Sequence, residues 1–315
     1  MKAVRIHRFG DADVLRVEDV EMPQPVDDEV LVRVTAASLN PVDTKIRTSG
    51  GRFKKEADLP VAMGRDLCGR IEALGTRAHN MLSEGQRLFA MIGFDRGAWA
   101  DYAVLRATEM AAVPDRLSDE EAAAVPLAGL TAWQGLVDHG GVAAGQRVLI
   151  HGGSGGVGHF AVQIAKALGA EVFATASGDG VEFVRSLGAD HVIDHRAQRF
   201  EDDAANVDVV LDLIGGDTQQ RSWDVLAPGG IIVSTLTPPK PQAGQGDDGR
   251  RGVDFIVDPK GVDLLKIAAM IEDGVVIPHV QESFALADVA AAARRMEGGT
   301  IRGKLVIRVG GEGAA

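Results

Sequence analysis

A glycine-rich segment between an apolar run and an amphipathic helix constrains the fold of this chain more than any other feature. Residues 151–158 have the sequence HGGSGGVG, in which Gly153, Gly155 and Gly158 match the spacing G-x-G-x-x-G. Residues 147–150 form a short β-branched run before it, and apolar residues recur at helical spacing after it. Glycine at these positions allows a tight turn, close approach of the backbone to a pyrophosphate, and close packing of helix on strand.

The segment therefore predicts a dinucleotide-binding turn. The free N–H groups at the start of the following helix suit an anionic phosphate. The residues expected to bind the cofactor here are Gly153, Ser154, Gly155, Gly156, Val157 and Gly158.

Strands and helices alternate around this turn. Strands are expected at 147–151, 171–175, 191–193, 207–212, 230–234 and 253–257. Strands alternating with helices of this length predict an α/β fold with a doubly wound, six-stranded parallel sheet, the Rossmann arrangement. The last helix of this region is expected at 263–272. Residues 237–252 are rich in Pro, Gly and charge and are expected to form a mobile surface loop.

The flanking regions have a mostly β character. Before residue 114, short strand-like runs are expected at 29–36, 67–74, 87–92 and 98–104. Ser118 and Glu121 form a capping box that starts a helix, which Pro126 and Gly129 interrupt. The C-terminal part is expected to contain a strand at 276–280, a helix at 286–296 and a strand at 304–309.

Composition excludes several classes of protein. The chain has 315 residues and a net charge of −12, which argues against nonspecific nucleic-acid binding. No apolar run approaches the ~20 residues of a membrane span, and no secretory signal opens the sequence, so we expect a cytoplasmic protein without a membrane partner. The single cysteine, Cys68, excludes an internal disulfide and a Cys-rich zinc site.

The end of the second strand indicates which dinucleotide binds. NAD enzymes place an Asp or Glu there to hold the ribose 2′-OH, whereas this chain has Ser177, which carries no charge to repel a 2′-phosphate. Arg185 and Arg196 are candidate phosphate partners or solvated charges. We therefore predict NADPH as the cofactor, while Asp179 leaves NAD open.

Six segments spread over the whole chain resemble the medium-chain dehydrogenase/reductase superfamily, within it the zinc-independent quinone oxidoreductases and enone or alkenal reductases. They are the glycine turn and residues 37–47, 64–69, 127–133, 187–190 and 303–306. The resemblance implies a GroES-like catalytic domain made of residues 1–120 and 276–315. A Rossmann NADP(H)-binding domain, 121–275, is then inserted between these two parts.

The resemblance also bears on the chemistry. Zinc-dependent members hold the metal with a Cys, a His and a further Cys or acid; here Asn40 and Arg65 stand in the first two places, and neither offers a zinc ligand. The eight histidines show no metal-ligand spacing. We therefore expect no metal, and hydride transfer from NADPH to a quinone or an α,β-unsaturated carbonyl, which can spread the incoming charge onto an oxygen.

By the same resemblance, Asn40, Asp43 and Lys45 are the candidate catalytic residues. Lys45 would hydrogen-bond the nicotinamide ribose or the enolate oxygen, and Asp43 would orient it. A turn at Asn40 with Asp43 as a helix cap is the alternative. Arg65 and Asp66 are expected to form an ion pair that holds the domain together.

Further cofactor contacts are expected from side chains at strand ends and from two more distant positions. Thr131 lies in a segment that resembles the nicotinamide-side helix of the family, although packing is an equal alternative. Lys304 could reach the cofactor, although a surface position on a terminal strand is more common. The remaining candidates are Ser177, His195, Ile214, Gly215, Ser234 and Thr235, for which ordinary strand-to-helix turns are the alternative.

Two other functions remain open. The cofactor fold alone does not prove turnover, so the chain could be a non-catalytic, crystallin-like or regulatory NADPH-binding protein. The other alternative is an alcohol dehydrogenase of the same superfamily, which the missing zinc ligands oppose. The family also suggests a homodimer, paired through an edge strand at 254–257.

Overall fold

The computed structural model describes residues 1–78, 82–242, 245 and 248–310. The chain forms two compact units. The β-rich unit contains Met1–Leu127, Asp258–Glu272 and Pro278–Ala315, and the parallel-sheet unit contains Ala128–Val257 and Asp273–Ile277. No helix among the described residues has both the length and the apolar character needed to cross a membrane.

The parallel-sheet unit is built on six strands in the order β11-β10-β9-β12-β13-β14. All neighbouring pairs are parallel. The strands are β9 (Arg147–His151), β10 (Glu171–Ala176), β11 (His191–Asp194), β12 (Val207–Asp212), β13 (Leu226–Ser234) and β14 (Arg251–Asp254). Numbered within the unit, this is the order 3-2-1-4-5-6 of a Rossmann fold, which confirms the predicted sheet.

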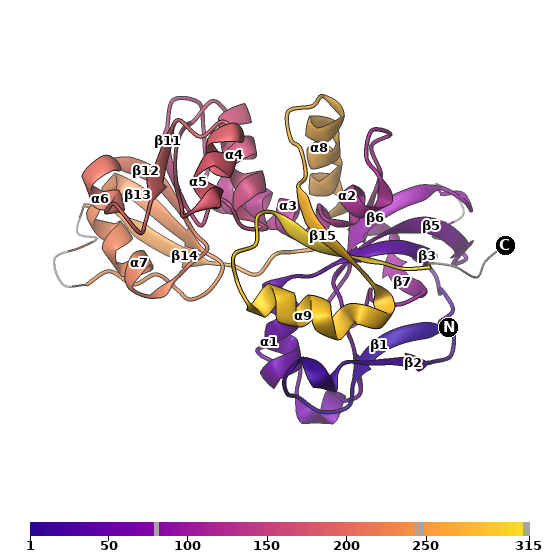
Figure 1. Ribbon diagram of the computed structural model, residues 1–315. Helices are drawn as coiled ribbons and strands as arrows, with labels where there is room; N and C mark the ends of the chain where they lie inside the picture. The colour runs from indigo at the N-terminus through magenta and orange to yellow at the C-terminus, as the bar shows by residue number, and fades with distance from the viewer. Residues whose placement is uncertain (79–81, 243–244, 246–247, 311–315) are drawn as a thin grey trace. The chain divides into compact units, whose positions relative to one another are not determined.

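Helices cover both faces of this sheet (Figure 1). They are α4 (Gly158–Ala167), α5 (Asp179–Ser186), α6 (Phe200–Asp203) and α7 (Gly216–Arg221). The central strands β9, β10 and β12 are therefore buried on both sides and are nearly continuous in apolar residues, whereas the edge strands β11 and β14 are partly exposed. One core cluster contains Phe173, Val210, Trp223 and Ile232, each at most 1% exposed.

The glycine turn follows β9 as predicted, and its glycines have different steric roles. Gly152 has φ +77°, in the left-handed region. A Cβ on Gly158 would lie 2.1 Å from the Gly152 carbonyl oxygen, so helix α4 can approach the turn only with glycine there. A Cβ on Gly155 would meet only that same oxygen, at 3.5 Å, so this glycine leaves space beside the turn.

The β-rich unit contains a three-stranded sheet, β2-β1-β4, and a seven-stranded sheet along the path β15-β16-β3-β5-β6-β8, with β7 on β3. The strands are β1 (Lys2–Ile6), β2 (Arg16–Asp19), β3 (Glu29–Ser38), β4 (Val61–Ala62), β5 (Asp66–Leu74), β6 (Arg87–Met91), β7 (Tyr102–Arg106), β8 (Met110–Ala112), β15 (Val280–Ala285) and β16 (Lys304–Arg308). The helices α1 (Pro41–Ser49), α2 (Asp119–Ala123), α8 (Gly261–Glu272) and α9 (Val289–Glu297) complete the unit. Because β16 pairs with β3, strands from the N-terminal and C-terminal parts of the chain share one sheet.

Several predicted element boundaries were wrong. Strand β7 begins at Tyr102 rather than at 98, because Ala98 and Trp99 hydrogen-bond instead to Gly64 and Met63. Strand β15 replaces the strand expected at 276–280. Its residues are mostly half-buried, so it has little of the alternation that marks a strand.

Strand β14 also differs from the strand predicted at 253–257, at both its start and its end. Strand β14 ends at Asp254, which pairs with Ser234, the last residue of β13. It begins inside the segment 237–252 that the sequence predicted as a loop, of which residues 243–244 and 246–247 lie outside the described part.

Helix α8 belongs to the β-rich unit, whereas residues 263–272 were predicted to lie in the dinucleotide-binding domain. A Cβ on Gly261 would lie 2.4 Å from the Met110 carbonyl oxygen, so α8 starts in close contact with β8. The predicted interruption of a helix at Gly129 was also wrong. Gly129 lies inside helix α3 (Pro126–Trp133), which continues into a π-helix, η5 (Gln134–His139). The capping box of α2 formed as predicted, with Ser118 accepting from the Glu121 amide at 3.2 Å.

Candidate functional site

Strand register brings four distant segments of the β-rich unit together at the end of β3. Ser38 pairs with Asp66 of β5 on one side and with Val306 of β16 on the other. The chain continues from Ser38 to Asn40, which precedes helix α1, while Lys304 is the first residue of β16. Antiparallel pairing therefore places Lys304 opposite Asn40.

Five buried side chains meet there, and we call them the polar cluster: Asn40, Asp43, Arg65, Asp66 and Lys304. Each is at most 3% exposed. The cluster holds two carboxylates and two cations, a composition in which buried charges can compensate one another.

Asp66 and Lys304 fix the amide of Asn40 from opposite ends. The Asn40 Nδ2 donates to Asp66 Oδ2 at 2.8 Å, while Lys304 Nζ donates to Asn40 Oδ1. The Lys304 ammonium also donates to the Leu39 carbonyl at 2.9 Å and lies 3.6 Å from Asp66 Oδ2. A cation at the amide oxygen and a carboxylate at the amide nitrogen leave one orientation of this side chain.

Asp66 accepts two more hydrogen bonds. Ser38 Oγ donates to its Oδ2 at 2.6 Å, and the Leu127 amide donates to its Oδ1 at 2.7 Å.

Lys304 is buried, contrary to the surface position that is common on terminal strands. Burial lowers the pKa of Lys304, and the carboxylates of Asp66 and Asp43 oppose this shift.

Arg65 occupies the place that the resemblance gives to a zinc-ligating histidine, but it faces different partners from those expected. Its guanidinium donates to the Gly93 carbonyl at 2.9 Å and to the Ala62 carbonyl at 3.1 Å, and it lies over the Phe94 ring at 5.5 Å. The ion pair expected between Arg65 and Asp66 was wrong. Arg65 Nε is 3.9 Å from Asp43 Oδ1, while Asp66 pairs with Lys304.

Asp43 lies in the first turn of α1 and faces into the cluster. Its Oδ2 accepts the Asn40 backbone N–H at 2.9 Å, and within the described residues its Oδ1 has no hydrogen-bond partner. Burial raises the pKa of Asp43 to about 7, against the lowering effect of Arg65 and with a further increase from Asp66. Lys45 is exposed on the same helix and lies outside the cluster.

In the parallel-sheet unit, Thr175 of β10 holds the start of the glycine turn. Its Oγ1 accepts the Gly152 N–H at 3.1 Å and its carbonyl oxygen accepts the Gly153 N–H at 2.9 Å. The described residues provide no backbone acceptor for the N–H groups of Gly156 and Val157. Free amides at a helix start, beside the space left by Gly155, fit a dinucleotide pyrophosphate.

Asp212, a fully buried carboxylate at the end of β12, was not among the residues predicted from the sequence. Its Oδ1 accepts the amides of Ile214 at 3.0 Å and Gly215 at 2.8 Å. Its Oδ2 accepts Ser234 Oγ at 3.0 Å and Gln219 Nε2 at 2.9 Å. Asp212 therefore fixes the turns after β12 and β13, where cofactor-binding residues were predicted. The sequence signal for this residue was an acidic side chain at the end of a buried strand, three positions before Gly215-Gly216.

The remaining predicted residues lie at several places in the parallel-sheet unit. Ser177 is half-buried after β10, and the exposed His195 donates its backbone N–H to Ala176, so these two residues follow neighbouring strand ends. Thr235 donates its N–H to the Asp212 carbonyl at 3.3 Å. Thr131 is buried in helix α3.

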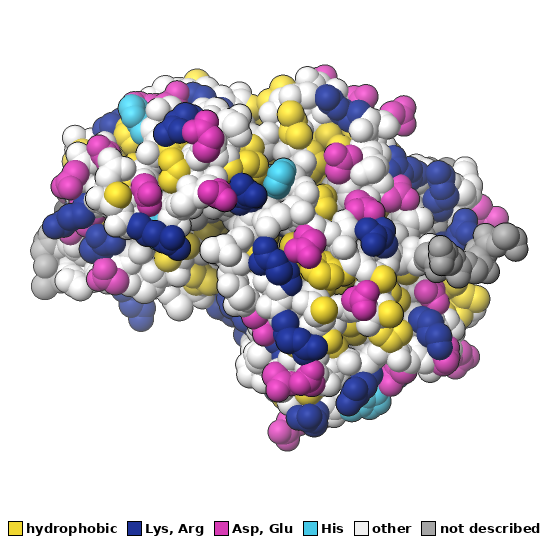
Figure 2. Space-filling model, in the orientation of Figure 1, with side chains coloured by type: hydrophobic (Ala, Val, Ile, Leu, Met, Phe, Trp, Pro, Cys, Tyr) yellow, Lys and Arg dark blue, Asp and Glu magenta, His cyan; other side chains and the backbone are white. Residues whose placement is uncertain are grey.

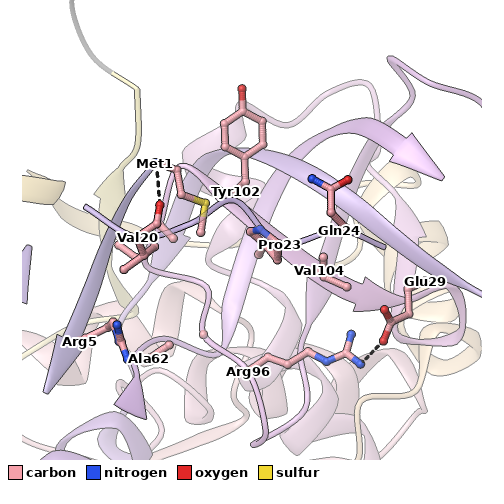
Figure 3. A pocket seen from close by; sticks show the side chains of 14 residues that line it. Met1, Arg5, Val20, Pro23, Gln24, Glu29, Ala62, Arg96, Tyr102 and Val104 are labelled. Carbon is pink, nitrogen blue, oxygen red and sulfur yellow. Dashed lines mark hydrogen bonds and ion pairs between the residues drawn. The ribbon is translucent and has the colours of Figure 1, made fainter. Parts of the chain in front are cut away.

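An open pocket of about 430 Å³ lies elsewhere in the β-rich unit, along β1 and β7 (Figure 3). Tyr102, Met1 and Val20 line it together with two arginines. These arginines are already paired, Arg96 with Glu29 at 2.6 Å and Arg5 with Glu18 at 3.1 Å. The predicted catalytic residues are not among those that line this pocket.

Two further features bear on metal and nucleic-acid binding. Within the described residues no group of three or more His, Cys, Asp and Glu side chains could hold a metal ion. Figure 2 shows Lys and Arg side chains interspersed with Asp and Glu over the visible face, without a continuous patch of either sign among the coloured residues.

The raised pKa of Asp43 predicts how stability depends on pH. The folded protein binds this proton more tightly than the unfolded chain, whose pKa is near 3.8, so stability present below pH 4 is lost as pH rises through about 7. In Asp43→Asn this loss is absent. The unfolding free energy of the variant, relative to the unsubstituted protein, should therefore increase by roughly 1.4 kcal/mol per pH unit between pH 5 and pH 7 in urea denaturation.

Asp19→Asn is the control for this measurement. A hydrogen bond from Lys2 lowers the pKa of Asp19, so Asp19 stabilises the fold above about pH 4 and this contribution disappears as pH falls further. The unfolding free energy of Asp19→Asn, relative to the unsubstituted protein, should therefore stay constant between pH 5 and pH 7. Parallel pH profiles for Asp43→Asn and the unsubstituted protein would contradict the prediction.

Comparison with known proteins relates both units to one family. The family described as "Alcohol dehydrogenase GroES-like domain" matches residues 26–115, and the family described as "Zinc-binding dehydrogenase" matches residues 187–307. The GroES-like match confirms the fold expected for the mostly β part of the chain.

Individual relatives match nearly the whole chain. A 2-methylene-furan-3-one reductase of Solanum lycopersicum is 35% identical over 98% of this chain and 79% of its own length. The chloroplastic NADPH-dependent alkenal/one oxidoreductase of Arabidopsis thaliana is 34% identical over the same shares. The solved quinone oxidoreductase of Coxiella burnetii superposes with a TM-score of 0.91 at 33% identity, covering 98% of this chain and 99% of that one.

These matches agree with the strand order, the glycine turn and the shared sheet of the two chain ends. The chain belongs to the medium-chain dehydrogenase/reductase superfamily, in the group of the quinone oxidoreductases and enone or alkenal reductases.

Proposed function

We propose that this protein is a zinc-independent, NADPH-dependent oxidoreductase that reduces a quinone or an α,β-unsaturated carbonyl. The observation that carries the proposal is the polar cluster, in which the Lys304 ammonium contacts Asn40 and lies near Asp66. Asn40 stands where zinc-dependent relatives have a metal ligand. A built-in cation bonded to this residue would oppose binding of a second, divalent cation.

The parallel-sheet unit is proposed to bind NADPH through the glycine turn. Gly153, Ser154, Gly155, Gly156, Val157 and Gly158 would surround the pyrophosphate, and Ile214, Gly215, Ser234, Thr235 and Thr131 are proposed as further cofactor contacts. Ser177 and His195 follow neighbouring strand ends and present no carboxylate of their own to a 2′-phosphate. Bound NADPH supplies a hydride.

In the β-rich unit, the chain's own contribution is proposed to be orientation and hydrogen bonding. Asn40 gives one Nδ2 proton to Asp66, which leaves the second for an acceptor oxygen that becomes negatively charged during reduction. Lys304 and Asp66 hold this donor in place, and Asp43 holds the Asn40 backbone. Lys45, exposed on α1, is proposed as a further donor to the bound ligands.

The proposal also covers the partners of the protein and its location in the cell. The acceptor is a small molecule, and we propose neither a nucleic-acid nor a membrane partner. Strand β14 ends the described sheet, and Ile256 just beyond it is 42% exposed, which supports a homodimer through residues 254–257. The cytoplasm is the proposed location, in keeping with the single buried free cysteine, Cys68.

The proposed reaction is tested by following NADPH oxidation with 1,4-benzoquinone, 9,10-phenanthrenequinone and short enones. We expect turnover with at least one acceptor and a lower Kd for NADPH than for NADH, because no acid ends β10. Tight NADPH binding without turnover on any acceptor would favour the non-catalytic alternative. Tighter binding of NADH would contradict the cofactor assignment.

The two candidate lysines predict different variant behaviour. Lys304→Met leaves the buried Asp66 without its cation, which should cost roughly 3–5 kcal/mol of stability. At a temperature where the variant is folded, kcat/KM for the acceptor should fall at least about tenfold with the NADPH Kd within about twofold, because Asn40 loses its orientation.

Lys45→Ala is the matched control, since Lys45 is exposed and its loss should leave the unfolding transition unchanged. A contribution of Lys45 to ligand binding would appear as a higher KM or Kd. Unchanged kinetics would remove Lys45 from the mechanism, and unchanged kcat/KM in folded Lys304→Met would contradict the role of the polar cluster.

A further inference from the structure

A buried histidine lies directly before the glycine turn and has no part in the chemistry proposed above. His151 is the last residue of β9 and is fully buried. It lies between Thr175 of β10 and Ser222, the first residue of the short helix η6 (Ser222–Asp224). The Phe200 ring meets the imidazole edge-on, with 4.7 Å between the ring centroids.

The hydrogen bonds of its neighbours determine which nitrogen of His151 carries the proton. Ser222 Oγ donates its only proton to the Thr218 carbonyl at 2.7 Å. It can therefore only accept from His151 Nε2, which lies 2.9 Å away. His151 Nε2 must carry a hydrogen.

The other nitrogen faces a hydroxyl with a free proton. Thr175 Oγ1 accepts the Gly152 N–H at 3.1 Å, and His151 Nδ1 lies 3.3 Å from the same oxygen. If Nδ1 is unprotonated, the hydroxyl proton points at it while an oxygen lone pair faces Gly152. Every polar atom along the hydrogen-bonded path from the Thr218 carbonyl to the Gly152 N–H then has a partner, as buried polar groups require.

Burial keeps the imidazole of His151 neutral, and the charged groups around it act in both directions. Burial lowers the pKa of His151 to about 4. Asp212 of β12 and Glu201 of α6 raise it, whereas Arg221 of α7 and His195 lower it further. The imidazole is therefore neutral throughout the range from pH 5.5 to pH 8.

We propose that His151 is a positioning residue for the dinucleotide site. As a neutral Nε2–H imidazole, it turns the Thr175 hydroxyl into the orientation that accepts the Gly152 N–H, and so fixes the start of the glycine turn. Thr175 holds two consecutive turn amides, those of Gly152 and Gly153, and the turn then presents the amides of Gly156 and Val157. This inference rests on the proposed binding of NADPH at that turn.

The tautomer is tested first in the cofactor-free protein. In protein labelled with 15N-histidine, the His151 signals are assigned by their loss in His151→Phe. We expect Nε2 to show one-bond coupling to a proton and Nδ1 to show none, unchanged between pH 5.5 and pH 8. A proton on Nδ1, or titration within this range, would overturn the assignment.

The positioning role is tested by the Kd for NADPH. Thr175→Val removes the acceptor of the Gly152 N–H without changing side-chain size, and we expect the Kd to rise about tenfold. Thr175→Ser restores the hydroxyl and should bind within about twofold of the unsubstituted protein. Ser222→Ala removes the acceptor of Nε2–H and should raise the Kd about threefold, which provides a second variant if Thr175→Val fails to fold.

Gln163→Leu is the matched control, because Gln163 is a buried residue of α4 whose hydrogen bonds go to the His159 carbonyl in its own helix and to the backbone of Ile277, outside residues 151–158. It should lose stability without a change in Kd. Binding by the unsubstituted protein with unchanged Kd in Thr175→Val and Ser222→Ala would overturn this inference alone. Failure of the unsubstituted protein to bind NADPH would overturn the proposed function instead.

Discussion

The pairing of β16 with β3 is the interaction on which the candidate chemistry depends. It brings Lys304 against Asn40, and the pairing of β3 with β5 adds Asp66 on the other side. Neither Lys304 nor Asp66 could be buried alone, because an isolated charge in the interior costs several kcal/mol. Together they compensate one another and hold an amide in one orientation. The stability of the β-rich unit and the geometry of the site therefore depend on the same contacts.

Buried polar side chains also order the parallel-sheet unit. Asp212 fixes the turns after β12 and β13, and Thr175 fixes the start of the glycine turn. The Asp212 carboxylate accepts two backbone amides, and Thr175 accepts one through its hydroxyl and one through its carbonyl oxygen. The turns at the carboxyl ends of these strands are therefore held before any ligand binds. Such preorganisation lowers the entropic cost of binding. The glycines supply the remaining requirement, which is space close to the backbone.

Local features were predictable from the sequence, and long-range ones were not. The glycine turn, the capping box at Ser118 and the six strands of the parallel sheet depend on neighbours along the chain, and they were predicted correctly apart from their exact bounds. The burial of Lys304 depends on a partner 264 positions away, which no local pattern indicates. Arg65 stands next to Asp66 in sequence, yet it lies just before β5, where its guanidinium bonds the Gly93 and Ala62 carbonyls, while Asp66 pairs with Lys304. The half-buried strand β15 had too little alternation to be located.

The central claim is that a lysine ammonium, rather than a metal ion, is the cation of this site. Its most direct test is the NADPH-dependent reduction rate of the purified protein after exhaustive chelation, with zinc content determined by mass spectrometry on the same sample. The account predicts less than about 0.1 zinc per chain and an unchanged rate, since Asn40 and Arg65 supply no zinc ligands. A rate that falls on chelation and returns on addition of zinc would contradict it.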